Sequence, residues 1–204
     1  MPTPVLTKPN TITDPGWLYY APLSTAIPDM TVVNSVFSVA WATPWTWLGM
    51  SDSGSDWHYN MTESPIDVAE LYDPIQHRIT ARMGSVGFSL ANYTASNLAL
   101  AQNGAIKTVT GNMTTGTTPV ASPTTTLTKV TPVQPGQETR FMLGWESTTG
   151  DVRKIAYQCL NTGDIVEAYN KAPAKTLIAF NAMFEIPAST VIPSETWFAG
   201  ATRG

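Results

Sequence analysis

Three long segments of this 204-residue sequence contain no Asp, Glu, Lys or Arg, namely Met30 to Ser51, Met83 to Ile106 and Thr108 to Thr128. Charged residues make up 13% of the chain, about half of the usual share, whereas hydrophobic residues make up 43%. Ser, Thr and Asn fill many polar positions instead. Because charge depletion is typical of surfaces buried between subunits, the composition favours a self-associating protein. A secreted β-protein with a Ser/Thr surface is the alternative.

The chain is long enough for one domain whose core needs no disulfide or metal. Its single cysteine, Cys159, has no internal partner, and 11 Lys+Arg against 15 Asp+Glu give a net charge of −4. This balance argues against a protein that grips nucleic acid by its phosphates. Met1 to Asn10 lacks the basic start and apolar run of a secretory signal, so we expect synthesis in a cytoplasm. Polar residues interrupt Met30 to Ser51, so we expect no membrane insertion.

Pro and Gly divide the chain into three predicted regions. Six prolines in residues 1–30 predict an extended N-terminal arm, which would lay its aromatic side chains on its own domain or on a neighbour. Residues 31–187 are predicted to form a β-domain that contains a Thr-rich excursion at 108–137. Residues 188–204 are predicted to form a C-terminal tail that carries Trp197 and Phe198.

Alternating hydrophobicity predicts the strands of this domain. The clearest pattern covers residues 177–186 and places Ile178, Phe180, Ala182, Phe184 and Ile186 inward. Gly84 and Gly87 predict a bulge, and the Gly-, Ser- and Asp-rich residues 45–59 predict a loop between tryptophans. Strands are predicted at residues 32–42, 66–72, 75–90, 141–147, 152–160, 165–169 and 177–186.

One helix is expected after the long strand at residues 75–90. Thr94 is a suitable N-cap, apolar residues recur at helical spacing, and Asn103-Gly104 supplies a left-handed stop. The fold class that follows is mainly β (α+β), an antiparallel β-sandwich or barrel with one flanking helix and extended terminal arms.

The sequence contains few groups for catalysis or metal binding. Ser55, Asp56 and His58 suggest a hydrolase site only on paper, because neighbours on a strand point to opposite faces and no nucleophile elbow is present. Asp52, Gly54, Asp56 and His58 weakly resemble a calcium loop that lacks its bidentate glutamate. We therefore expect no catalytic residue, no metal and no cofactor, and we interpret Cys159 as a core residue.

The order of several short motifs resembles the major tail tube proteins of long-tailed bacteriophages, especially those that infect actinobacteria. The resemblance covers most of the chain, although the Thr-rich excursion and the C-terminal tail have no counterpart in it. The motifs are Tyr20-Ala21-Pro22, Ile27-Pro28-Asp29, Trp47-Leu48-Gly49-Met50-Ser51-Asp52-Ser53-Gly54, Glu70-Leu71-Tyr72-Asp73-Pro74-Ile75, Arg82-x-Gly84-x-Val86-x-Phe88-x-Leu90 and Thr94-x-x-Asn97-Leu98-Ala99-Leu100-Ala101.

The resemblance implies a non-enzymatic virion protein, made in the host cytoplasm, whose hexameric rings stack into a phage tail tube for genome ejection. Its partners would be copies of itself and the tape measure, terminator and distal tail proteins, with DNA only as passing cargo. Another virion component, such as a terminator, adaptor or tip protein, remains an alternative, as do a carbohydrate-binding or adhesion module and a His58 hydrolase. The candidate subunit-interface residues are Trp17, Leu18, Tyr19, Tyr20, Trp45, Trp47, Gly49, Gly54, Trp57, Trp197 and Phe198.

Overall fold

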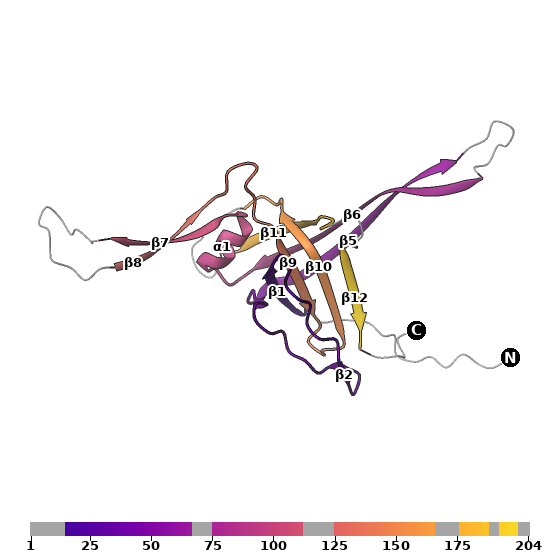
Figure 1. The fold of residues 1–204 in the computed structure, drawn as a ribbon, viewed down its shortest axis with the longest axis horizontal. Helices are drawn as coiled ribbons and strands as arrows, with labels where there is room; N and C mark the ends of the chain where they lie inside the picture. Colours follow the sequence, from indigo (N-terminus) through magenta and orange to yellow (C-terminus); the bar gives the residue numbers. More distant parts are fainter. Residues whose placement is uncertain (1–14, 67–74, 112–124, 166–175, 188–191, 200–204) are drawn as a thin grey trace, which may run out of the picture.

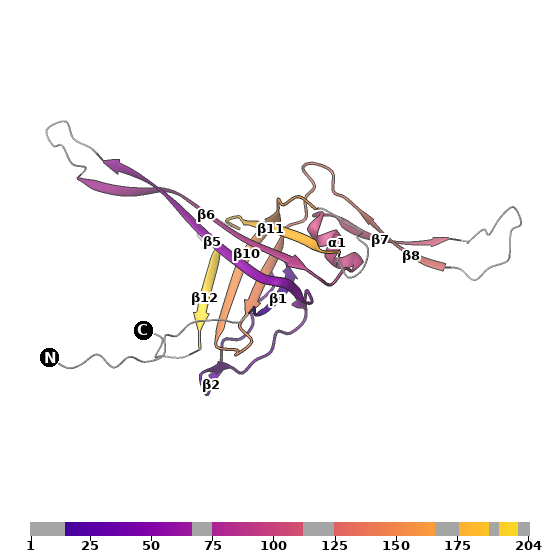
Figure 2. The same ribbon diagram turned by 180° about the vertical axis from the view of Figure 1, so that it is seen from behind.

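The fold is mainly β, as a computed structural model of the chain shows for residues 15–66, 75–111, 125–165, 176–187 and 192–199. These residues form twelve strands and one helix, and every strand pair is antiparallel. A central body carries two hairpins that project from opposite sides (Figures 1 and 2). The predicted fold class is therefore confirmed at the level of antiparallel β-structure with one helix.

The body is built around one sheet that divides at β10 (Val152–Asn161). One edge of β10 pairs with β9, while its other edge pairs with β12 through residues 152–156 and with β11 through residues 159–161. The strand order is β4-β1-β9-β10-β11-β6-β5. Their bounds are β1 (Trp17–Pro22), β4 (Thr46–Trp47), β5 (Ser51–Ile66), β6 (Gln76–Leu90), β9 (Phe141–Glu146), β11 (Ile178–Phe184) and β12 (Ser194–Phe198).

Both faces of the central strands are covered, which explains the unbroken apolar run of β9. All residues from Phe141 to Trp145 are buried. One face packs on β6, β11 and the helix through the main core, and the other packs on Trp45 and Met30 from the segment before β4. Strands that are buried on both faces lose the period-two alternation.

The segment at residues 23–45 is held on the sheet by Arg153. This side chain is 1% exposed, and its guanidinium donates hydrogen bonds to the Glu146 carboxylate at 3.1 Å and to the carbonyl oxygens of Asp29 at 3.3 Å and Val39 at 2.5 Å. The guanidinium also lies 4.7 Å from the centre of the Phe37 ring. A buried charge with this many partners is a strong tertiary anchor.

Both termini of helix α1 (Ala95–Ala101) are capped as the sequence predicts. The Thr94 hydroxyl accepts a hydrogen bond from the Asn97 N–H at 3.2 Å, and Asn103 adopts a φ of 48° at the C-terminal end. Inside the helix, the buried Asn97 amide donates to the Leu48 carbonyl at 2.9 Å. The helix is thus tied to the chain just before β5.

Two predicted regions need correction because tertiary pairing converts them into strands. Residues 17–22, assigned to the N-terminal arm, form β1 between β4 and β9, with Leu18 and Ala21 in the core. Residues 194–198 of the predicted tail form β12 along β10. Of the other residues assigned to the arm and the tail, those at 1–14, 188–191 and 200–204 lie outside the described part.

The predicted loop at residues 45–59 is also wrong, because β5 begins at Ser51. The five residues of β5 from Ser51 to Ser55 oppose the three residues of β6 from Leu90 to Phe88, and Gly54 adopts a φ of 83° within this irregularity. A bulge of this kind uses the same Gly, Ser and Asp residues as a loop. The bulge predicted at Gly84 and Gly87 is absent, since β6 keeps a regular register there.

Other strand predictions hold with changed ends. Those at 75–90, 141–147, 152–160 and 177–186 are confirmed, although Ile186 lies beyond β11 and is exposed. Residues 32–42 contain only the short hairpin of β2 (Val32–Val33) and β3 (Val36–Phe37). The ends of the Thr-rich excursion pair as β7 (Ala105–Gly111) and β8 (Thr125–Thr131). The predicted strands at 66–72 and 165–169 fall largely outside the described residues.

Candidate functional site

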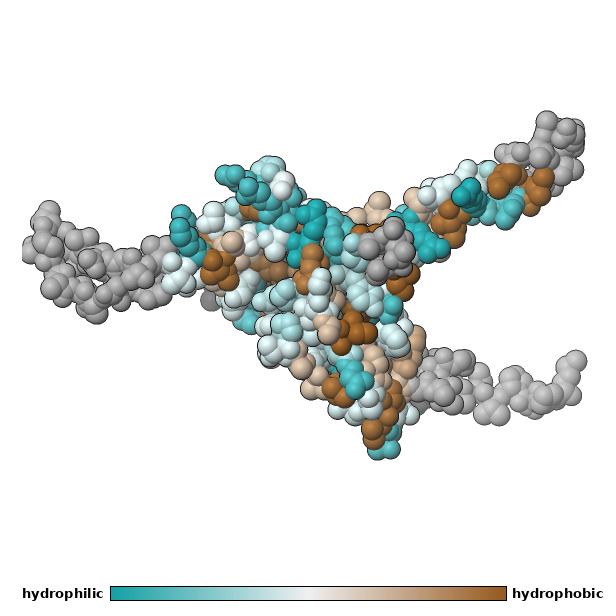
Figure 3. All heavy atoms as spheres, viewed as in Figure 1, coloured by the Kyte–Doolittle hydropathy of each residue, from teal (hydrophilic) through white to brown (hydrophobic). Residues whose placement is uncertain are grey.

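The outer part of the β5–β6 hairpin is exposed along its whole described length. We call residues 59–66 and 75–83 the hairpin arm. All of these residues are exposed, whereas β6 becomes buried from Gly84 onward. The arm leaves the body as a two-stranded ribbon and carries hydrophobic residues far from the core (Figures 1 and 3).

Apolar side chains change faces where β6 leaves the body. Within the body, Val86, Phe88 and Leu90 are buried in the main core. In the arm, Ile79 and Met83 occupy the opposite parity and are 47% and 58% exposed. Because alternate residues of a strand lie on opposite faces, the two sets point in opposite directions. The hydrophobic pattern of the arm therefore does not continue the core.

The change of face occurs at Gly84. A Cβ at this position would overlap the ring of Phe184, which packs over the strand at the edge of the body. In the hairpin arm, which lies on the other side of Gly84 from the body, no described core element covers either face of the ribbon. Every side chain of the arm is therefore exposed. We define the apolar stripe as Ile75, Ile79, Ala81 and Met83.

The two faces of the arm differ in charge. On the stripe face, Ile79 lies opposite Glu63, and the exposed His77 ring lies 3.6 Å from the Glu63 carboxylate. The opposite face carries Arg78 and Arg82, with Met61 directly across from Arg82. An exposed pair such as His77 and Glu63 contributes little to stability. The stripe is thus an apolar surface that the fold of the single chain leaves exposed.

The predicted interface residues differ widely in exposure. Leu18 and Trp45 are buried in the body's own core. Gly49 and Gly54 adopt φ angles of 98° and 83°, so they shape the chain before and within β5. Tyr19, Tyr20 and Trp57 are half-buried, whereas the exposed aromatic residues are Trp17, Trp47, Trp197 and Phe198.

The exposed aromatic residues form two separate surfaces. The rings of Trp17 and Trp47 contact edge to face with centroids 5.8 Å apart, and Met50 lies beside Trp47. Trp197 and Phe198 lie on β12, which pairs with β10 and is separated from β1 and β4 by β9 and β10 in the sheet. The aromatic prediction therefore found exposed surface at β1, β4 and β12 but missed the hairpin arm.

The residues considered for catalysis or metal binding do not converge. Asp56 and His58 lie opposite Gly87 and Ser85 on the outer face of β5, while Ser55 lies opposite the buried Phe88. In the described part of the chain, no group of three His, Cys, Asp or Glu residues could hold a metal ion. Burial raises the pKa of the Cys159 thiol, with the Glu185 charge adding to the shift, so the thiol stays protonated at neutral pH.

No helix within the described residues is both long enough and apolar enough to cross a membrane. Comparison with known proteins gives no family match, and no curated protein is significantly similar to the sequence.

Proposed function

We propose that this chain is a structural subunit that associates with copies of itself, and specifically the subunit of a bacteriophage tail tube. The observation that carries the proposal is the apolar stripe on the projecting hairpin arm. In a virion, stacked rings of such subunits would form the conduit for genome ejection. The tape measure, terminator and distal tail proteins would contact the ends and lumen of that tube.

The energetics of the stripe support association rather than folding. Burying the exposed parts of Ile75, Ile79 and Met83 would contribute about 3 kcal/mol per hairpin arm. One such contact gives weak binding, but in a closed ring each subunit would donate one arm to one neighbour and receive one arm from the other. The combined contacts of a closed ring are then strong enough for a stable assembly.

The charge of the chain also supports a conduit. A net charge of −4 and the lack of long cationic stretches give DNA little to bind. A tube that held its cargo tightly would slow its passage. Low charge together with an apolar contact surface fits a lumen-forming assembly better than a nucleic-acid-binding protein.

Electron microscopy of the concentrated protein tests this proposal. The wild type should form tubes, and the double variant Ile79→Asp/Met83→Asp should remain folded and monomeric by circular dichroism and sedimentation. Gln76→Asp/Thr80→Asp is the matched control, because it places the same charge on the opposite face of β6 and should still form tubes.

Two results would contradict the proposal. Tubes formed equally well by the double variant would exclude the stripe as the contact. Single rings that never stack, yet still depend on the stripe, would instead favour a terminator or adaptor.

A further inference from the structure

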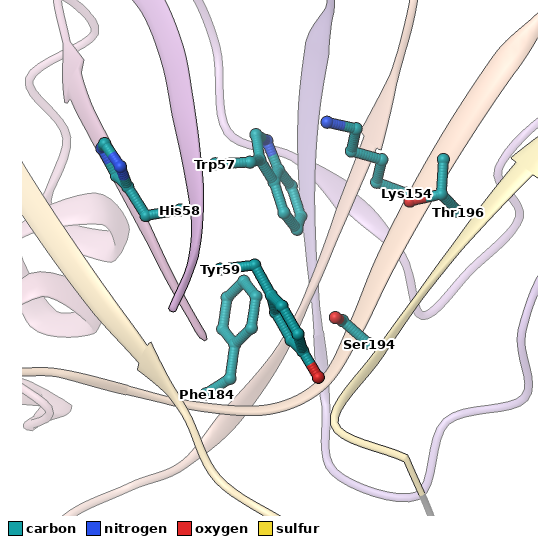
Figure 4. Close-up of a pocket in the computed structure, with 7 residues that line it drawn as sticks. All are labelled: Trp57, His58, Tyr59, Lys154, Phe184, Ser194 and Thr196. Atoms are coloured by element: carbon teal, nitrogen blue, oxygen red, sulfur yellow. The ribbon is translucent and has the colours of Figure 1, made fainter. Parts of the chain in front are cut away.

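A small cavity of about 200 Å³ lies near the root of the hairpin arm, between β5 and β12 (Figure 4). Trp57 and Tyr59 of β5 line one side, and Ser194 and Thr196 of β12 line the other. The cavity is smaller than the roughly 300–1,000 Å³ of sites for drug-sized molecules. It can therefore accept a single ring or one side chain. Its remaining lining residues are His58, Lys154 and Phe184.

The ammonium of Lys154 has no anionic partner among the described residues. Its Nζ lies 5.3 Å from the ring centre of Trp57 and 5.5 Å from that of Trp145, so aromatic faces are its main protein contacts. Burial lowers the pKa of Lys154 because it removes water from the charged form. Three N–H donors therefore lie beside a cavity without a carboxylate to accept from them.

The other walls of the cavity limit the chemistry of a ligand. Trp57 and Phe184 contact at 5.6 Å between ring centres, and the Tyr59 ring stands beside Phe184 (Figure 4). Such faces accept the C–H side of a saturated ring. The hydroxyls of Ser194 and Thr196 can donate to or accept from ligand hydroxyls. The His58 ring points away from this group (Figure 4).

We propose that this cavity binds an acidic monosaccharide of the hexuronate type. Its carboxylate would pair with the Lys154 ammonium, its ring would lie against the aromatic wall, and its hydroxyls would meet β12. A phosphate would favour an arginine fork, and a plain carboxylic acid would leave the aromatic wall and the hydroxyls unused. The proposal does not depend on the tail tube function.

Binding of D-glucuronate at pH 7 tests the site directly. Saturation-transfer NMR, together with the indole N–H signal of Trp57, should report a dissociation constant on the order of 1 mM. Glucose, which lacks the carboxylate, and acetate, which lacks the ring, should each bind at least about tenfold more weakly, a difference of about 1.4 kcal/mol.

Two variants separate the parts of the site. Lys154→Met should weaken glucuronate binding at least tenfold, whereas the control Lys129→Met on β8 should leave it unchanged. Tyr59→Ala alters an exposed side chain and should weaken glucuronate binding while leaving the weak binding of acetate unaffected. The Ile79→Asp/Met83→Asp chain should bind glucuronate like the wild type, which separates this result from assembly.

Three results would overturn the proposal. Equal binding of glucose and glucuronate would exclude recognition of the carboxylate. Unchanged binding by Lys154→Met would place the ligand elsewhere. Acetate that displaces glucuronate at equimolar concentration would show a general carboxylate contact instead of a sugar site. Binding of an acidic peptide by a protein that does not bind glucuronate would show the same.

Discussion

The two halves of β6 share a period-two hydrophobic pattern, but the inner half buries its apolar side chains and the outer half exposes them. In the body, Val86 and Phe88 point into a core that is closed by β9, β10 and β11. In the hairpin arm, Ile79 and Met83 point to the other face and remain exposed. Because a one-residue change of parity exchanges the faces of a strand, the arm's pattern cannot serve this core. The comparison indicates that the core depends on the inner half of β6, and we propose that association depends on the outer half.

The largest expected difference is between two aspartate substitutions three residues apart. Val86→Asp would bury an unpaired carboxylate at a fully buried position and should cost about 3–5 kcal/mol of unfolding free energy. Met83→Asp should change it by no more than about 0.5 kcal/mol. Urea denaturation at a concentration where the chain is monomeric measures both. Similar losses for the two variants would show that the arm belongs to the folding unit.

A second comparison concerns cations. Arg153→Met would leave the Glu146 carboxylate without its buried partner and release the segment at residues 23–45, at a cost of about 3–5 kcal/mol. Arg82→Met, on the exposed arm, should leave stability within about 0.5 kcal/mol of the wild type. Thermal unfolding of both variants tests this difference. A stable Arg153→Met protein would contradict the role of Arg153 as the anchor of that segment.

Glycines in the sheet give a smaller effect. A Cβ at Gly144 would overlap the Trp41 ring, so Gly144→Ala should cost about 1–3 kcal/mol by forcing that ring off β9. At Gly87 a Cβ would meet nothing within 4 Å, so Gly87→Ala should be neutral or slightly stabilising. Chemical denaturation distinguishes them. Equal effects would mean that Trp41 does not pack on β9 as described.

The smallest expected effect is a pH dependence at Lys154. Its pKa is lowered in the folded chain by burial, so the unfolded chain binds more protons between the folded pKa and the ordinary value of 10.5. The wild type should therefore gain stability relative to Lys154→Met as the pH rises through that window. Below the folded pKa the difference should be constant. Paired denaturation curves from pH 7 to pH 10.5 measure it, and a difference that falls with pH would contradict the assignment.

Much of the fold could be predicted because local patterns and tertiary structure agree. Strand β11 and helix α1 follow the alternation at Phe180 and the caps at Thr94 and Asn103. Strand β5 was missed because its bulge at Gly54 has the composition of a loop. Period-two alternation identifies the two faces of a strand, but it does not show which face meets a core.

The candidate sites depend on tertiary structure for the same reason. The alternation from Ile75 to Met83 was visible in the sequence, yet only the position of Gly84 beside Phe184 shows where the body ends. The cavity near Lys154 joins side chains from β5, β10, β11 and β12. No local pattern in the sequence brings these four strands together.

A cryo-electron microscopy reconstruction of the assembled protein would show directly whether the hairpin arm makes the contact between subunits. We expect a neighbouring copy to cover Ile75, Ile79 and Met83 in every repeat, while Val86 and Phe88 remain inside the body. An assembly in which this stripe stays open to solvent, with subunits joined through other surfaces, would contradict this expectation.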